Sequence, residues 1–112
     1  MPLFSIIMVT SYLAGGAVLL WVGVKGGSET LPRNDWIGIR THKTLSSDEA
    51  WLTGHKAAAG YLKASSVPMI LGGIFFIFAS DEQIGYATLP TAGITFVLVM
   101  LAVRKAHTAI SE

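Results

Sequence analysis

Three apolar runs in a short, weakly charged chain predict an all-α membrane protein with three transmembrane helices. Of its 112 residues, 52% are hydrophobic and only 13% are charged, whereas soluble domains usually carry about 25% charged residues. The runs cover residues 3–24, 57–79 and 84–103. Each is about 20 residues or longer, so each can cross a hydrocarbon core of about 30 Å as a helix. We therefore expect a single membrane domain over residues 1–112.

The composition also excludes several classes of function. The formal net charge is +1, which argues against the basic face of a nucleic-acid-binding protein. The chain has no cysteine, so disulfides, thiolate catalysis and cysteine-based metal sites are excluded. It also lacks a glycine-rich phosphate loop and a nucleotide fingerprint. We expect no cofactor and no nucleic-acid partner.

The first span, residues 3–24, is predicted to be a true transmembrane helix and not a cleaved signal peptide. No lysine or arginine precedes the run, and it is longer than the apolar core of a signal peptide. The Lys25–Ser28 stretch should end the helix, because its glycines favour a C-terminal cap. Gly15-Gly16 here and Gly72-Gly73 in the second span either allow a neighbouring helix to approach closely or face lipid.

The second span, residues 57–79, should follow an amphipathic lead-in from Ser47. Ser46 and Glu49 have the spacing of a capping box, which predicts a helix start at Ser46. Four residues downstream recur at helical spacing on one face. They are Trp51, His55, Ala59 and Leu62.

Two residues complicate the second span. Lys63 must extend its ammonium group to the lipid headgroups if the span begins near residue 57. Pro68 lies inside the run, just after a pair of serines, so we expect a kink or break at residues 65–68.

The third span, residues 84–103, should follow a short polar turn at residues 81–83. Basic residues occur in the first loop and in the C-terminal tail, whereas the second loop carries only Asp81 and Glu82. Because basic residues concentrate on the cytoplasmic side, we expect the first loop and the C-terminus in the cytoplasm and the N-terminus outside.

The polar segment, residues 31–55, contains most of the polar and aromatic chemistry of the chain. The candidate binding residues are Arg33, Asn34, Trp36, Gly38, Arg40, Thr41, Trp51 and His55. The arginines suit a phosphate or carboxylate, or Arg40 and Asn34 serve only to hold the loop on the following helix. We expect Asn34 and Arg40 to fold back against Trp51 and His55 as a compact cytoplasmic cap. The tryptophans are either binding residues or interfacial anchors.

No catalytic or metal site is predicted in this segment. The histidines lack the i, i+4 spacing of a helical metal site. Ser47, His55 and Asp48 form a triad on paper only, because no nucleophile elbow accompanies them. We therefore expect a protein that is not an enzyme and holds no metal.

The run RNDWIGIRTHKTLSSDEAWLTGH resembles the SdpI family of small bacterial integral membrane proteins. The matching positions are Asn34, Gly38, Ile39, Arg40, Thr41, Ser47, Trp51 and His55. His42 departs from the pattern, since many members carry proline there. The resemblance implies a multi-pass protein of the bacterial plasma membrane. It also implies immunity to a secreted toxic peptide, with a second role in tethering a transcriptional repressor to the membrane.

A binding or immunity protein is therefore the leading hypothesis. The alternative is a small accessory subunit of a larger bacterial membrane complex, which the paired glycines favour. A transporter or channel is disfavoured, because only Lys63 approaches the position of an intramembrane ionisable residue. The lipid bilayer is the expected partner, and a protein partner or a homo-oligomer within the membrane stays open.

Overall fold

The three apolar runs form long helices in the computed structural model, which describes residues 2–110. They are α1 (Leu3–Gly27), α2 (Asp48–Phe78) and α3 (Asp81–Ala109), and a short 3₁₀ helix, η1 (Thr44–Ser46), precedes α2. None of the described residues forms a β-strand. All three α-helices are long and apolar enough to cross a membrane. The predicted fold class, an all-α membrane protein with three spans, is confirmed.

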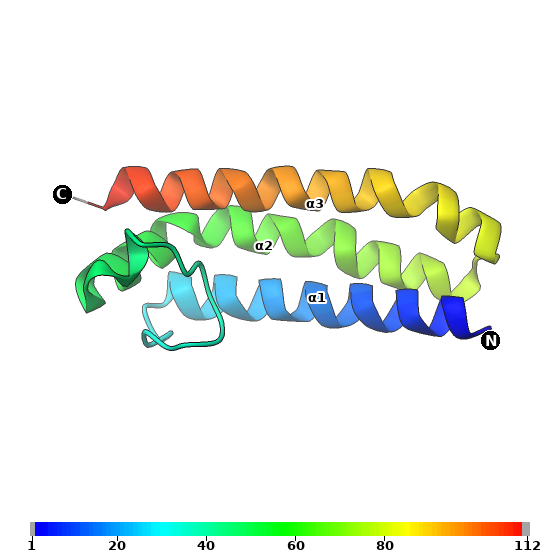
Figure 1. Ribbon diagram of the computed structural model, residues 1–112, viewed down its shortest axis with the longest axis horizontal. Coiled ribbons are helices and arrows are strands. Elements are labelled where there is room, and N and C mark those ends of the chain that lie inside the picture. The colour runs from blue at the N-terminus through cyan, green and yellow to red at the C-terminus, as the bar shows by residue number, and fades with distance from the viewer. Residues whose placement is uncertain (1, 111–112) are drawn as a thin grey trace.

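Helix α2 is the central helix of the bundle. Figure 1 shows α1, α2 and α3 side by side with α2 in the middle, and each neighbouring pair is antiparallel. Helices α1 and α3 pack mainly on α2 and barely contact each other. The bundle measures 49 × 20 × 20 Å. The loop 28–47 and the end of α3 lie at one end, and the start of α1 and the α2–α3 turn lie at the other (Figure 1).

Apolar side chains cover the outside of the helices. Leu3 is 72% exposed, Phe78 is 83% exposed and Leu89 is 80% exposed. Soluble monomers rarely expose apolar patches of this extent. The surface is therefore the one expected for helices surrounded by lipid.

Glycines bring α1 and α2 into close contact. A Cβ added to Gly16 would lie 2.6 Å from Cγ1 of Ile70, and one on Gly73 would lie 2.7 Å from Cδ2 of Leu13. Gly15 and Gly72 also face side chains of this chain. The prediction that the paired glycines let a neighbouring helix approach closely is therefore confirmed, and the neighbouring helix belongs to the bundle itself.

The start of α2 differs from the predicted one. Ser47, not Ser46, is the N-cap, and its hydroxyl oxygen accepts a hydrogen bond from the Ala50 amide at 2.9 Å. Ser46 belongs to η1, so the predicted capping box with Glu49 is wrong. The lead-in and the second span form one continuous helix.

A capping box does occur, at the start of α3. The Ser80 hydroxyl accepts from the Gln83 amide at 3.2 Å, and the Gln83 side chain accepts from the Ser80 amide at 3.0 Å. Residues 81–83, predicted as a polar turn, are therefore the first turn of α3. Their polar character suits a helix start as well as a turn, since acidic residues stabilise the positive end of the helix dipole.

Pro68 lies inside the continuous helix α2, so the predicted break is wrong, and the alternative of a kink at residues 65–68 stays a prediction. The hydroxyl groups of Ser65 and Ser66 donate to the carbonyls of Leu62 and Lys63 at 2.7 and 2.6 Å. Both serines are buried. Their hydroxyls are therefore satisfied within α2 and need no partner from another helix.

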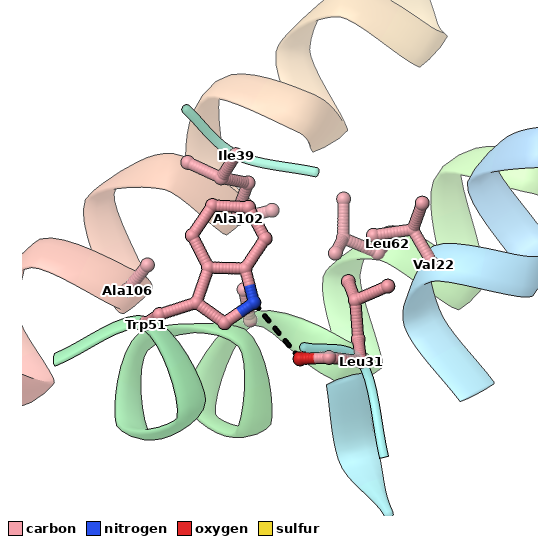
Figure 2. Packing of buried hydrophobic residues seen from close by; sticks show 8 residues of the cluster. Val22, Leu31, Ile39, Trp51, Leu62, Ala102 and Ala106 are labelled. Carbon is pink, nitrogen blue, oxygen red and sulfur yellow. Dashed lines mark hydrogen bonds between the residues drawn. The ribbon is translucent and has the colours of Figure 1, made fainter. Parts of the chain in front are cut away.

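The core has two parts, one toward each end of the bundle. The part under the polar segment contains Val22, Leu31, Ile39, Trp51, Ala58, Leu62, Ala102 and Ala106 (Figure 2). The other part contains Tyr12, Phe76 and Ile84. There the Tyr12 hydroxyl donates to the Thr88 carbonyl at 2.8 Å, which links α1 to α3.

Candidate functional site

Trp51 is the centre of the polar segment. Its side chain has no exposed surface, and its indole Nε1 donates to the Leu31 carbonyl at 2.9 Å (Figure 2). Figure 2 also shows Ile39 on one side of the ring. Trp51 is therefore a core residue that packs against the start and the middle of the loop, and the interpretation of Trp51 as an interfacial anchor is wrong.

His55 lies one turn further along α2 and is also fully buried. Its Nε2 accepts a hydrogen bond from the Ile39 amide at 2.9 Å, so this nitrogen carries a lone pair. Its Nδ1 lies 2.8 Å from the Trp51 carbonyl, which can only accept. The ring is therefore neutral with its hydrogen on Nδ1. Both nitrogens are occupied by the backbone, and the Ile39 amide is satisfied away from water.

Gly38 is the point where the loop comes closest to α2. Its φ angle is +127°, a conformation that L residues rarely adopt. A Cβ at this position would lie 2.7 Å from Cη2 of Trp51 and 2.9 Å from Nε2 of His55. Glycine is required here for two separate reasons, the backbone angle and the missing side chain.

Two threonines continue the polar contacts from the loop to α3. The buried Thr44 hydroxyl donates to the Ile39 carbonyl at 2.6 Å and lies 3.0 Å from the Thr41 amide. The Thr41 hydroxyl lies 2.8 Å from Nε2 of His107 on α3. The loop is thus tied to α2 through His55 and to α3 through His107. Neither Thr44 nor His107 was among the candidate binding residues predicted from the sequence.

Asn34 builds a tight turn with both ends of its amide. Its Oδ1 accepts from the amides of Trp36 and Ile37 at 2.8 and 2.7 Å. Its Nδ2 donates to the carbonyls of Pro32 and Ile37 at 3.0 Å each. An aspartate would reproduce only the accepted bonds, so this position needs an amide.

Trp36 projects from this turn and is 88% exposed. The two tryptophans of the polar segment therefore have opposite environments. Trp51 lies in the core, whereas the ring of Trp36 is exposed at the surface of the protein. An indole so exposed is stabilised when lipid headgroups or another protein cover it.

The arginines lie at the edge of the polar segment. Nε of Arg40 donates to the Asn34 carbonyl at 3.3 Å. Arg33 donates to the Leu45 carbonyl at 3.0 Å and pairs with Asp48 at 3.1 Å. The residues that contact Trp51 and His55 are Leu31, Gly38 and Ile39. Asn34 and Arg40 are hydrogen-bonded to each other, and their packing against Trp51 and His55 stays a prediction.

A polar hollow of about 300 Å³ separates the two arginines. Its lining is Arg33, Asn34, Asp35, Arg40 and Leu45. The hollow combines two guanidinium groups with the carboxylate of Asp35, and Arg33 is already paired with Asp48, so Arg40 is the guanidinium group with no ion pair described in this hollow.

The described residues contain no cluster of three or more His, Asp or Glu side chains that could hold a metal ion. Two members of the hypothetical Ser47–His55–Asp48 triad make hydrogen bonds to backbone groups. The Ser47 hydroxyl caps α2, and both nitrogens of His55 bind backbone groups.

The comparisons agree with the resemblance carried by the polar segment. No curated protein and no solved structure matches the chain. The family model of the SdpI/YfhL protein family matches residues 30–103, which is more than half of the chain. The match covers the polar segment, all of α2 and most of α3. The chain therefore belongs to the SdpI/YfhL protein family.

Proposed function

We propose that this membrane protein is a non-enzymatic binding protein with an immunity-type role against a membrane-active toxic peptide. Membership of the SdpI/YfhL family supports this proposal. The observation that carries it is Trp36, which is 88% exposed on a turn fixed by four hydrogen bonds of Asn34. A rigid, exposed aromatic residue beside arginines has the composition of a binding hot spot.

The proposal places the polar segment in the cytoplasm and the N-terminus outside. All 8 lysines and arginines lie in residues 25–63 or at residues 104–105. The opposite end of the bundle carries only acidic charge near the α2–α3 turn, from Asp81 and Glu82 in the first turn of α3, so the asymmetry follows the positive-inside rule. Reporter fusions at Ser28 and Gln83 test this orientation. A cytoplasmic reporter at Gln83 would contradict it.

The outer surface offers little area for a peptide under this orientation. It consists of the start of α1 and the turn before α3, whereas a specific protein interface buries about 800 Å² per partner. The surface around Trp36 is the better candidate, because it combines an exposed ring with the polar hollow between Arg33 and Arg40. A membrane-linked signalling role, in which this surface binds a cytoplasmic protein, uses the same residues.

A protection assay tests the role of Trp36. Bacteria sensitive to a membrane-active peptide would express the wild type, Trp36→Ala or Trp21→Ala, at equal membrane levels. Trp21 is the matched control, because it is 45% exposed but lies within the span α1. We expect protection to fall with Trp36→Ala only. Equal protection by both variants would contradict the proposal.

The accessory-subunit hypothesis has lost its supporting observation. It rested on paired glycines free to pack with partners, and these glycines pack inside the bundle. Gly60, Gly85 and Gly93 have open space beside them. Single small residues facing lipid need no partner, so they do not restore the hypothesis.

A further inference from the structure

An apolar groove lies between α1 and α3, at the end of the bundle that carries the loop. It has a volume of about 290 Å³. Its walls and floor include Val18 and Val22 of α1, Leu62 of α2, and Val99 and Val103 of α3. The groove exists because α1 and α3 both pack on α2 and contact each other over a small area only. Leu62, 2% exposed, belongs to the core beneath it.

The lining indicates what the groove can hold. The helices contribute only aliphatic side chains to it. The loop residues 38–41 supply the rest of the lining, so polar partners for water can come from the loop only. The groove is also too small for a peptide helix, whose interface would have to bury about 800 Å² on each side. One flexible hydrocarbon chain, entering from the surrounding bilayer, fits both its size and its chemistry.

Arg40 joins the groove to the polar hollow, because it lines both. Its Nε is held by the Asn34 carbonyl at 3.3 Å, which orients the guanidinium group. The two terminal nitrogens can bind a phosphate in a bidentate manner. Asp35 lines the same hollow and repels additional negative charge. The phosphate of an anionic lipid is therefore a suitable partner for the Arg40 guanidinium group.

We propose that the groove binds one acyl chain of an anionic phospholipid, with the lipid phosphate against Arg40. Basic pockets at the cytoplasmic ends of transmembrane helices bind anionic head groups in this way. The site shares Arg40 with the proposed peptide-binding surface, whereas Trp36 does not line the groove, so lipid retention and protection are tested by different measurements. A specific lipid here would also fill the space between α1 and α3.

Native mass spectrometry of the detergent-purified protein tests the proposal. The delipidated protein would be offered phosphatidylglycerol or phosphatidylcholine, and the retained lipid would be counted. Val18→Phe and Val99→Phe fill the groove from opposite walls. Val97→Phe is the matched control, because Val97 is 56% exposed on α3 and does not line the groove. Arg40→Gln removes the head-group contact, and Lys56→Gln removes an equal charge at the same end.

We expect the wild type and Val97→Phe to retain one phosphatidylglycerol, and both groove-filling variants to lose it. Arg40→Gln should lower the preference for phosphatidylglycerol over phosphatidylcholine about fivefold, whereas Lys56→Gln should not. Excess inorganic phosphate should leave the lipid bound, because the acyl chain of the lipid anchors it in the groove. Displacement by phosphate, or equal retention by all three phenylalanine variants, would overturn the proposal.

The folding of each variant is checked by its circular-dichroism melting curve. Val18 is 48% exposed at the rim of the groove, so phenylalanine there can occupy the groove without displacing fully buried residues. If Val99→Phe fails to fold, Val18→Phe decides the question alone. Full lipid retention by folded Val18→Phe would overturn the proposal.

Discussion

Replacing Gly38 with alanine should destabilise the whole polar segment. At a φ angle of +127° an L residue is strained, which costs on the order of 1–3 kcal/mol. The new Cβ would also lie 2.9 Å from Nε2 of His55, the atom that accepts the Ile39 hydrogen bond. Leaving a buried donor without its partner costs about 1–3 kcal/mol. Because the two effects overlap, we expect a loss of about 3 kcal/mol in the free energy of unfolding.

The assay is reversible unfolding in mixed micelles, followed by circular dichroism. Gly93→Ala is the matched control, because a Cβ there meets nothing within 4 Å and Gly93 lies inside α3. Alanine in a helix is more favourable than glycine by about 0.5–1 kcal/mol, so the control should be slightly stabilised. If Gly38→Ala is as stable as Gly93→Ala, the packing of the loop on Trp51 and His55 is not as described.

Three further changes test the same segment. His55→Phe should cost about 1–3 kcal/mol by leaving the Ile39 amide unpaired, whereas His55→Gln, which keeps an acceptor, should cost less in the same unfolding assay. Asn34→Asp should accelerate limited proteolysis of the turn relative to Asp35→Asn, because it loses two donors; equal rates would count against the turn. Glu29 has a φ angle of 59°, so Glu29→Gly should raise stability by about 1 kcal/mol. Glu29→Ala should not raise stability, because alanine is also strained at a positive φ angle. Both variants lose the Glu29–Lys56 ion pair, which is exposed and therefore contributes little.

The fold could be predicted because the membrane imposes a simple pattern. Three apolar runs of sufficient length become three helices. The helix ends were less predictable, since α3 continues beyond residue 103 to Ala109. Hydropathy indicates where the apolar part of a span ends, whereas the helix continues as far as its capping residues. The cap of α3 at Ser80 was missed because serine before acidic residues also suits a turn.

The candidate site was only partly predictable. The sequence places Trp51 and His55 on one helical face, and both are buried. It cannot distinguish Trp51 from Trp36, because burial depends on how the loop returns to α2. The role of His107 was also out of reach, since its contact with Thr41 joins residues 66 positions apart. The glycines were recognised as packing residues, but the helix that packs on them is visible only in the folded bundle.

The central claim is that the surface of the polar segment, and not the outer turn, carries the activity of the protein. The most direct test compares two double variants in cells that lack the chromosomal gene. One combines Trp36→Ala with Arg40→Ala, and the other combines Asp81→Ala with Glu82→Ala. At equal membrane levels, we predict that the first loses protection against the toxic peptide and the second keeps it. Loss of protection by the outer-turn variant alone would contradict the account.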